Sequence, residues 1–261
     1  MGACRRRGFA RPFRPRLARP AAERLMPFVL HSYAGAQELA RDVACRWLDL
    51  LRNSATATPF TVALSGGRIP KLFYGELVLA AERQRLDAVH FFWGDERCVP
   101  PDDDESNYKL AAEHLFTPLE LSVAQIHRLQ VERGEEFAVA EGESQLRRFT
   151  QVSPSGQPVF DLILLGMGED GHIASLFPNE SEELITRPAV YRAVTGPKPP
   201  PRRLTLGYPA IASARQVWVL ASGSGKEAAL KKSISGNGDT PLARVLRLRE
   251  STDIFTDIPL D

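Results

Sequence analysis

The sequence predicts an α/β fold with a doubly wound, mostly parallel sheet and helices on both faces. Four short apolar runs, at residues 60–64, 89–93, 161–165 and 217–221, have the length and composition of buried strands, and each ends in a polar turn that contains glycine. Helical patterns follow at least three of these turns, and strands that alternate with helices form parallel sheets. Because ligands bind beyond the carboxyl ends of such strands, we expect the four turns to meet in one pocket.

Length and charge divide the chain into two parts. We assign residues 26–261 to a single α/β domain and residues 1–25, which hold eight Arg and one acidic residue, to an Arg- and Pro-rich, disordered extension with Met26 as a candidate start. A targeting or nucleic-acid-binding arm is the alternative for this extension. The net charge of +1 leaves about −6 for residues 26–261, and a mildly acidic domain does not favour nucleic acid.

Cysteine spacing and hydropathy indicate the kind of cellular compartment in which the protein is expected. Cys4, Cys45 and Cys98 are widely spaced and match neither a disulfide framework nor a metal-binding pattern, so we expect a reducing, cytoplasmic location. No apolar run approaches the length that a membrane span requires.

The predicted fold begins with a strand at residues 28–32 and a helix at residues 35–51, whose apolar residues recur at helical spacing and belong to the core. The first candidate binding motif lies between the strand at 60–64 and a helix predicted over residues 71–85. A glycine loop that leads into a helix presents free N–H groups and the positive end of the helix dipole, which favours a phosphate. An ordinary strand–turn–helix joint is the alternative. The candidate residues are Ser65, Gly66, Gly67 and Arg68.

The second candidate motif follows the strand at 89–93. Two adjacent carboxylates and an arginine stand at the strand end, where charges need solvent, partners or a ligand. The acidic run at 102–105 lacks the spacing and the glycine of a calcium loop. A Ser-Asn pair then precedes a helix predicted over residues 108–116, and the pair can supply the N-cap of that helix. The candidate residues are Asp95, Glu96, Arg97, Ser106 and Asn107.

The third motif, residues 166–178, is the centre of the predicted site. It has three glycines within six residues, including Gly168, and glycine lets a ligand approach main-chain N–H groups closely. Asp170 and His172 lie two residues apart in this turn, and histidine can give and take protons near neutral pH. The alternative for His172 is a turn histidine that caps backbone groups.

The same turn matches the G-x-G-x-x-G pattern of dinucleotide-binding proteins, but only weakly. That motif requires a long helix next and an acidic residue at the end of the second strand. Pro178 follows too soon for such a helix, and the next apolar run, at 189–194, ends without a carboxylate. We therefore expect no dinucleotide cofactor.

Two further cations complete the candidate set. A proline-rich extended segment at 197–201 leads to Arg203, and the strand at 217–221 ends in a glycine turn that holds Lys226. The latter turn suits an anion but is not a Walker A loop, because Glu227 stands where Ser or Thr is required. The other predicted elements are a short strand at 126–129, helices at 134–151, 227–234 and 241–248, and an edge strand at 253–256.

Taken in order, these motifs resemble the 6-phosphogluconolactonase family. The matching patterns are SGG-x-x-P at 65–70, D-E-R-x-V-P and S-N within 95–107, G-x-G-x-D-G-H-x-A-S-L-F-P at 166–178, R-x-T-L at 203–206 and G-x-G-K at 223–226. The resemblance covers roughly residues 28–250 and implies a Rossmann-like α/β hydrolase of the oxidative pentose phosphate pathway. Such an enzyme converts 6-phospho-D-glucono-1,5-lactone to 6-phospho-D-gluconate without a metal or organic cofactor.

For this reaction we expect His172 to activate water, Asp170 to orient His172 and Asp95 to help bind sugar hydroxyls. The phosphate would lie at Ser65–Arg68, neutralised by some of Arg97, Arg203 and Lys226. We expect a monomer or weak dimer whose partner is a phosphorylated sugar lactone, with no nucleic acid and no membrane.

Two alternatives stay open. Related glucosamine-6-phosphate deaminases carry a Glu that orients the catalytic His, and Phe177 is the matching residue here, which disfavours isomerisation because that reaction needs an acid and a base on two carbons. A sugar-phosphate sensor would need a DNA-binding helix-turn-helix, for which residues 1–27 are too short and too rich in proline. A departure from the family is Arg68, where many members carry Ser or Thr.

Overall fold

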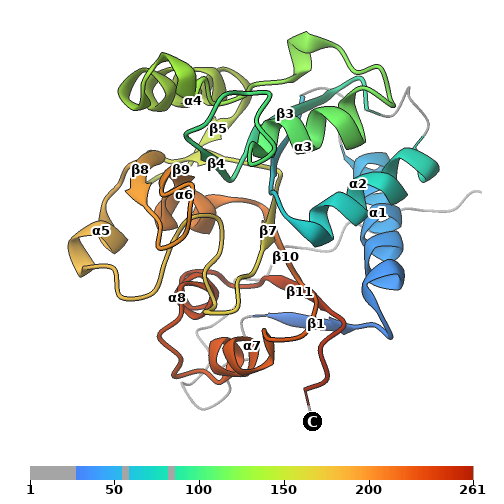
Figure 1. Ribbon diagram of the computed structural model, residues 1–261, viewed down its shortest axis with the longest axis vertical. Coiled ribbons are helices and arrows are strands. Elements are labelled where there is room, and N and C mark those ends of the chain that lie inside the picture. The colour runs from blue at the N-terminus through green and yellow to red at the C-terminus, as the bar shows by residue number, and fades with distance from the viewer. Residues whose placement is uncertain (1–27, 55–58, 82–85, 261) are drawn as a thin grey trace, which may run out of the picture.

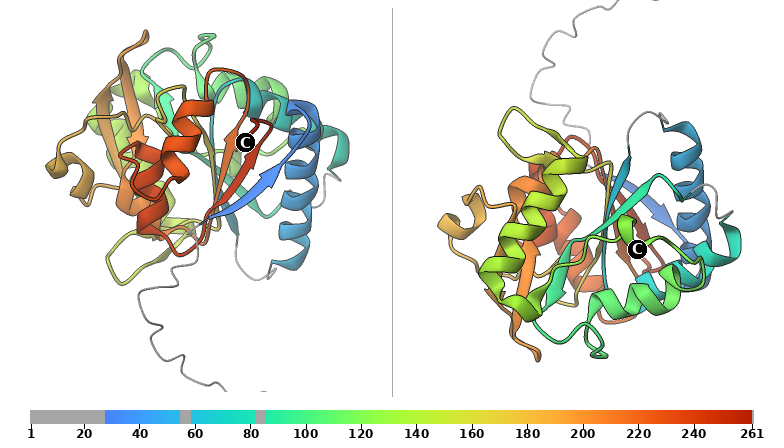
Figure 2. Two further views of the ribbon diagram at one scale, coloured as in Figure 1. Left: turned by 90° about the horizontal axis from the view of Figure 1, so that it is seen from below. Right: turned by 90° about the horizontal axis from the view of Figure 1, so that it is seen from above.

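The computed structural model describes residues 28–54, 59–81 and 86–260, so the extension expected at 1–25 lies outside the described residues. A six-stranded parallel sheet with helices on both faces forms the centre of the fold, which confirms the predicted fold class (Figures 1 and 2). In spatial order its strands are β1 (Val29–Ser32), β11 (Asp253–Thr256), β10 (Gln216–Ala221), β7 (Leu162–Gly166), β2 (Phe60–Leu64) and β3 (Val89–Trp93).

The central strands are buried on both faces, because helices cover each side of the sheet. Every residue of β2 is buried, as are Leu162–Leu165 of β7, and near-continuous apolar strands are typical of parallel sheets. One face is covered by α1 and α2 and the other by α7 and α8 (Figure 2). The helices are α1 (Ala36–Asn53), α2 (Arg68–Ala80), α3 (Asn107–Ala111), the π-helix η2 (Ala112–Phe116), α4 (Glu135–Phe149), α5 (Glu182–Thr186), α6 (Tyr208–Ser213), α7 (Glu227–Ile234) and α8 (Pro241–Leu248), with 3-10 turns η3 (Val123–Gln125) and η4 (Val131–Arg133).

Three predicted elements differ from the structure. The strand predicted at 126–129 is wrong: Ile126 makes a single bridge to Phe91, directly after the 3-10 turn η3. The strand at 253–256 exists, but β11 lies between β1 and β10 and is not an edge strand. The helix predicted from residue 71 begins at Arg68, because Pro70 fits the first turn, and it ends at Ala80; the predicted end at 82–85 lies outside the described residues.

A second, antiparallel sheet was not predicted. Its strands are β4 (Asp95–Arg97), β9 (Arg202–Leu206) and β8 (Tyr191–Thr195). From the sequence, 95–97 was expected to be a polar turn, and 202–206 was assigned neither strand nor helix. The chain leaves the main sheet at Gly94 and enters β4 at once, so this sheet extends from the end of β3. A third, two-stranded sheet joins β5 (Gln151–Val152) to β6 (Pro158–Val159).

A crevice forms where two neighbouring strands of the main sheet separate. β2 pairs with β3 over five residues, but it pairs with β7 only at Val62 and Ala63. Beyond this point β2 and β7 no longer pair, and the hydroxyl of Ser65 accepts a hydrogen bond from the N–H of Gly166 at 3.2 Å. Ligands of doubly wound sheets bind at such a point, where neighbouring strands connect in opposite directions. In the described part of the chain, no helix has both the length and the apolar composition to cross a bilayer.

Candidate active site

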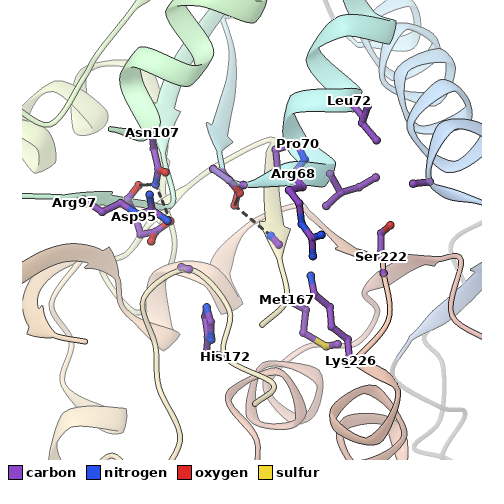
Figure 3. A pocket seen from close by; sticks show the side chains of 18 of the residues that line it. Arg68, Pro70, Leu72, Asp95, Arg97, Asn107, Met167, His172, Ser222 and Lys226 are labelled. Carbon is purple, nitrogen blue, oxygen red and sulfur yellow. Dashed lines mark hydrogen bonds between the residues drawn. The ribbon is translucent and has the colours of Figure 1, made fainter. Parts of the chain in front are cut away.

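A cavity of about 400 Å³ lies beyond the carboxyl ends of the central strands (Figure 3). This volume lies in the range typical of small-molecule sites. Residues from all four predicted glycine turns line it, so the turns do meet in one pocket. The predicted site residues that line the cavity are Ser65, Gly66, Gly67, Arg68, Asp95, Arg97, Asn107, His172, Arg203 and Lys226.

We distinguish two walls of this cavity. The parallel wall comprises the turns that follow β2, β7 and β10, which are Ser65–Arg68, Gly166–His172 and Ser222–Lys226. The antiparallel wall comprises Asp95, Arg97 and Arg203 of β4 and β9, with Asn107 of α3 beside them.

Four predicted site residues do not line the cavity. Asp170 and Gly168 lie in the turn that carries His172, and Ser106 is the N-cap of α3, its hydroxyl accepting from the N–H of Lys109. Glu96 is buried behind the antiparallel wall. These residues contact cavity-lining groups from outside the cavity.

The imidazole of His172 is held by the carboxylate two residues before it. Asp170 Oδ1 lies 2.6 Å from His172 Nδ1 and accepts from the His172 N–H at 3.1 Å. With Nδ1–H donating to Asp170, Nε2 carries the free lone pair. Partial burial opposes ionisation of Asp170, but the hydrogen bonds and the charge of His172 outweigh it and lower the pKa of Asp170. Asp170 therefore remains a carboxylate that orients the ring.

Glycine is required in this turn for steric reasons. A Cβ on Gly168 would lie 2.1 Å from the His172 ring, and a Cβ on Gly171, where φ is +80°, would lie 2.8 Å from Thr240. Ala174, which also lines the cavity, has φ of +48°, a conformation that costs a non-glycine residue roughly 1–2 kcal/mol. The chain therefore adopts a costly conformation beside the imidazole, as is common at functional sites.

The loop after β2 leads directly into α2. Gly67 is the N-cap, with φ of +103°, and no side chain caps the helix. The first N–H groups of α2 therefore have no helical acceptor, and the positive end of the helix dipole faces the cavity. A Cβ on Gly66 would lie 1.8 Å from Asn107 Oδ1, so Gly66 permits close contact between this loop and α3.

Two cations of the parallel wall face each other. The side chains of Arg68 and Lys226 extend toward one another from α2 and from the N-cap of α7 (Figure 3). Neither makes an ion pair within 4.0 Å with a described carboxylate. Burial lowers the pKa of Lys226, and the charge of Arg68 lowers it further, while Glu169 and Asp257 act in the opposite direction. This pair would be stabilised by a bound anion.

The charged groups of the antiparallel wall are held by neighbours. Asp95 accepts from the hydroxyl of Ser175 at 2.6 Å and from the amide of Asn107, whose Nδ2 lies 2.8 Å from the Asp95 carbonyl oxygen and 3.4 Å from Oδ1. Ser175 is fully buried and belongs to the loop of His172, so it connects the two walls.

The two arginines of this wall also have protein partners. Arg97 donates to the carbonyl of Glu105 at 2.7 Å, and Arg203 donates to the carbonyl of Pro200 at 3.1 Å. Burial lowers the pKa of Arg203 from its ordinary value, and Arg97 adds to this effect. The guanidinium of Arg203 also lies 5.8 Å from the centre of the Phe177 ring, which in turn lies 5.2 Å from that of His172.

Several residues of this cavity were not predicted from the sequence. Asp257, directly after β11, accepts from the hydroxyl of Ser222 at 2.8 Å and from the N–H of Gly223 at 3.0 Å, and so fixes the turn that carries Lys226. Apolar side chains line the end near α1 and α2 (Figure 3). A polar residue after the last strand was the one available signal for Asp257. The unpredicted lining residues include Ala36, Ile69, Leu72, Met167, Ala174, Ser222 and Asp257.

The chemistry available in this cavity is proton transfer beside a bound anion. Within the described ranges, no group of three or more His, Cys, Asp or Glu side chains could hold a metal ion. The imidazole can accept a proton, the arginines and backbone N–H groups can stabilise negative charge, and Asp95 and Asn107 can bind hydroxyl groups.

Comparisons with known proteins identify relatives of this chain. Residues 34–254 match the family described as glucosamine-6-phosphate isomerases/6-phosphogluconolactonase. A 6-phosphogluconolactonase of Mycobacterium tuberculosis is 41% identical over 164 residues, which cover 60% of this chain and 66% of that protein. The chloroplastic 6-phosphogluconolactonase 3 of Arabidopsis thaliana is 35% identical over 211 residues, which cover 77% of this chain and 64% of that protein. The chain thus spans just under two thirds of the length of these relatives.

A solved structure extends the similarity to the fold. The structure of 6-phosphogluconolactonase from Trypanosoma cruzi superposes with a TM-score of 0.77 at 28% identity, covering 87% of this chain and 93% of that chain.

Proposed function

The chain belongs to the glucosamine-6-phosphate isomerase/6-phosphogluconolactonase family, and from this premise we propose that it hydrolyses 6-phospho-D-glucono-1,5-lactone to 6-phospho-D-gluconate. One observation carries the proposal: an imidazole oriented by a carboxylate shares a cavity with two cations that have no described carboxylate partner. A phosphate monoester, with a charge of about −1.5 to −2 at pH 7, would neutralise those cations. The names of the relatives support this reaction, which would belong to the oxidative pentose phosphate pathway.

The phosphate is held at the loop Ser65–Arg68. The free N–H groups at the start of α2 donate to its oxygens, and Arg68 and Lys226 neutralise its charge, with Arg203 approaching from the other wall. Asp95 and Asn107 then bind hydroxyl groups of the sugar. This arrangement directs the lactone carbonyl toward His172.

Hydrolysis requires one activated water. His172 Nε2 takes a proton from the water as its oxygen attacks the lactone carbonyl carbon, and Asp170 stabilises the imidazolium that forms. The tetrahedral intermediate collapses with cleavage of the bond to the ring oxygen, which takes up the proton from His172. The carboxylic acid that results releases its own proton to solvent and becomes the carboxylate product. A general base in this position contributes about 10²–10⁴ to the rate.

The developing oxyanion needs donors in the same cavity. Arg97 is a candidate because its buried Nε has no hydrogen-bond partner among the described residues. Hydrogen-bond donors that are already in position before the reaction often contribute as much to the rate as the general base does. We infer a cytoplasmic enzyme that acts without nucleic acid or membrane, as a monomer or weak dimer. Since the Arabidopsis relative is chloroplastic, the compartment stays a prediction.

The direct test is a pH-stat assay with freshly made 6-phosphogluconolactone, corrected for spontaneous hydrolysis. We expect acid release that is proportional to enzyme and saturates with substrate. Release of ammonia from glucosamine 6-phosphate would instead identify a deaminase. Binding of sugar phosphates without turnover of either compound would identify a sensor, and either result would overturn the proposal.

A further inference from the structure

Glu96 is a buried carboxylate that the reaction described above does not use. Only 3% of the residue is exposed, and it does not line the cavity. It precedes Arg97 in β4 and lies against the start of α3. Isolated buried charges are costly, so its contacts indicate its role.

Both oxygens of Glu96 are fully used as acceptors. Oε1 accepts from the N–H groups of Arg97 and Asn107, each at 2.8 Å. Oε2 accepts from the N–H of Tyr108 at 2.8 Å and from the hydroxyl of Ser106 at 3.3 Å. Two of these donors are among the first N–H groups of α3, which have no acceptor within the helix. Glu96 therefore caps the start of α3 together with Ser106, the N-cap residue.

The start of α3 carries a residue of the cavity. Asn107 donates from Nδ2 to the carbonyl of Asp95, and its Oδ1 occupies the space that a side chain at Gly66 would need. Asn107 thus contacts both walls. A displacement of α3 would move Asn107 away from Asp95 and from the loop Ser65–Arg68 together.

We propose that Glu96 is a positioning residue, whose ionised carboxylate holds Asn107 in the antiparallel wall and thereby fixes the contact between the two walls. This inference rests on the proposed function for its kinetic consequence, but not for its structural one. A neutral carboxyl group cannot replace the carboxylate, because its proton would meet a donor at whichever oxygen it occupies.

Protonation near neutral pH gives this role a measurable signature. Burial raises the pKa of Glu96 to about 7, the charge of Asp95 contributes to the rise, and the hydrogen bonds from Asn107, Arg97 and Tyr108 oppose it. Tyr74, Cys98 and Arg128 also interact electrostatically with Glu96, and the guanidinium of Arg97 is bound to Glu105. As the pH falls through about 7, the carboxyl group gains a proton and must release at least one of its four donors.

The kinetic test compares two replacements of Glu96. Glu96→Gln keeps the shape but sets an NH₂ group against two donors, so we expect it to lower kcat/KM about as much as Glu96→Ala, by tenfold or more, since small misplacements in a site can cost about 10²-fold. Asn107→Ala should have a similar effect, and the double variant Glu96→Gln/Asn107→Ala should lose little more than either single variant. Asp104→Asn is the matched control, because Asp104 lies in the loop between β4 and α3, is exposed and pairs with Lys109. The control should retain wild-type activity.

Amide NMR shifts of the wild-type protein supply a readout without turnover. The N–H signals of Asn107 and Tyr108 should titrate together with a midpoint near the pKa of Glu96, about 7, and this titration should vanish in Glu96→Gln. Wild-type kcat/KM in Glu96→Gln, multiplicative losses in the double variant, or amide signals that do not titrate would each overturn the inference. A wild-type protein that lacks lactonase activity would instead overturn the proposed function, and the amide titration would still decide the role of Glu96. If Glu96→Gln fails to fold, the wild-type titration decides alone.

Discussion

On the parallel wall of the cavity, Arg68 and Lys226 approach each other with no described carboxylate in ion-pair range. On the antiparallel wall, Asp95, Arg97 and Arg203 are each bound to a neighbouring side chain or carbonyl. Charges without partners are available to a ligand, whereas charges that are already bound mainly fix geometry. From this difference we propose that the parallel wall supplies most of the binding energy for the phosphate and that the antiparallel wall sets the orientation of the sugar.

The largest expected effect is on the parallel wall, at His172. His172→Ala should lower kcat at least about a hundredfold, because it removes the general base, while the fold remains intact. Steady-state kinetics with the phosphorylated lactone, together with circular dichroism, measures both quantities. Wild-type turnover in His172→Ala would exclude His172 as the general base, and the parallel wall would then not supply the catalytic group.

The next effect tests the unpaired cations. Lys226→Ala should raise KM for the phosphorylated lactone about 10- to 100-fold with a smaller change in kcat, because a hydrogen bond to a charged group contributes about 1.5–3 kcal/mol. Lys232→Ala, on the same helix but paired with Asp239, is the control and should leave KM unchanged. A loss of kcat without a change in KM would show that Lys226 orients the substrate and does not bind the phosphate, which would contradict the role proposed for the parallel wall.

Arg203 tests the opposite wall. Arg203→Ala should mainly raise KM, by about tenfold, since Arg203 already donates to backbone carbonyls and has less hydrogen-bonding capacity to offer the phosphate. The neighbouring Arg202→Ala removes an exposed arginine that pairs with Glu135 and should have no effect on KM. An unchanged KM in Arg203→Ala would remove Arg203 from the phosphate site.

The smallest effect on activity is expected for substitutions in a stack of aromatic rings that lies outside both walls. His90 Nδ1 lies 2.8 Å from His127 Nε2, and both rings pack on Phe149. Burial lowers the pKa of His127 to about 4, with further contributions from His90 and Arg148. The unfolded chain therefore binds protons more readily than the fold, and stability should fall as the pH drops from about 6.5 toward 4.

His127→Phe should remove much of this acid sensitivity, on the order of 2 kcal/mol at pH 4, while leaving kcat/KM near that of the wild type. Urea unfolding at pH 7 and at pH 4 measures the change. His114→Gln, which substitutes a histidine outside the ring stack, is the control. Equal acid sensitivity in wild type and His127→Phe would show that the stack does not sense protons.

Local signals in the sequence were sufficient to predict the parallel sheet and the turns that form the parallel wall of the cavity. Apolar runs flanked by glycine specify buried parallel strands because both faces of such strands exclude water, and the turns after them must then meet at one edge of the sheet. The spacing of Asp170 and His172 likewise permits their hydrogen bond within a single turn. The three-stranded sheet could not be predicted, since β4 has only three residues and finds its partner more than a hundred residues later.

The sequence by itself thus determined the buried strands, the glycine turns and the identity of the charged groups at the strand ends. Only the tertiary structure decided which of these charges have partners: Asp95 meets Ser175, Asp257 holds the turn before Lys226, and Glu96 lies against α3 and not in the cavity. The reason is physical. Chain-local geometry sets secondary structure and turns, whereas the partner of a charge depends on packing between segments that are distant in sequence, and no local pattern records that packing.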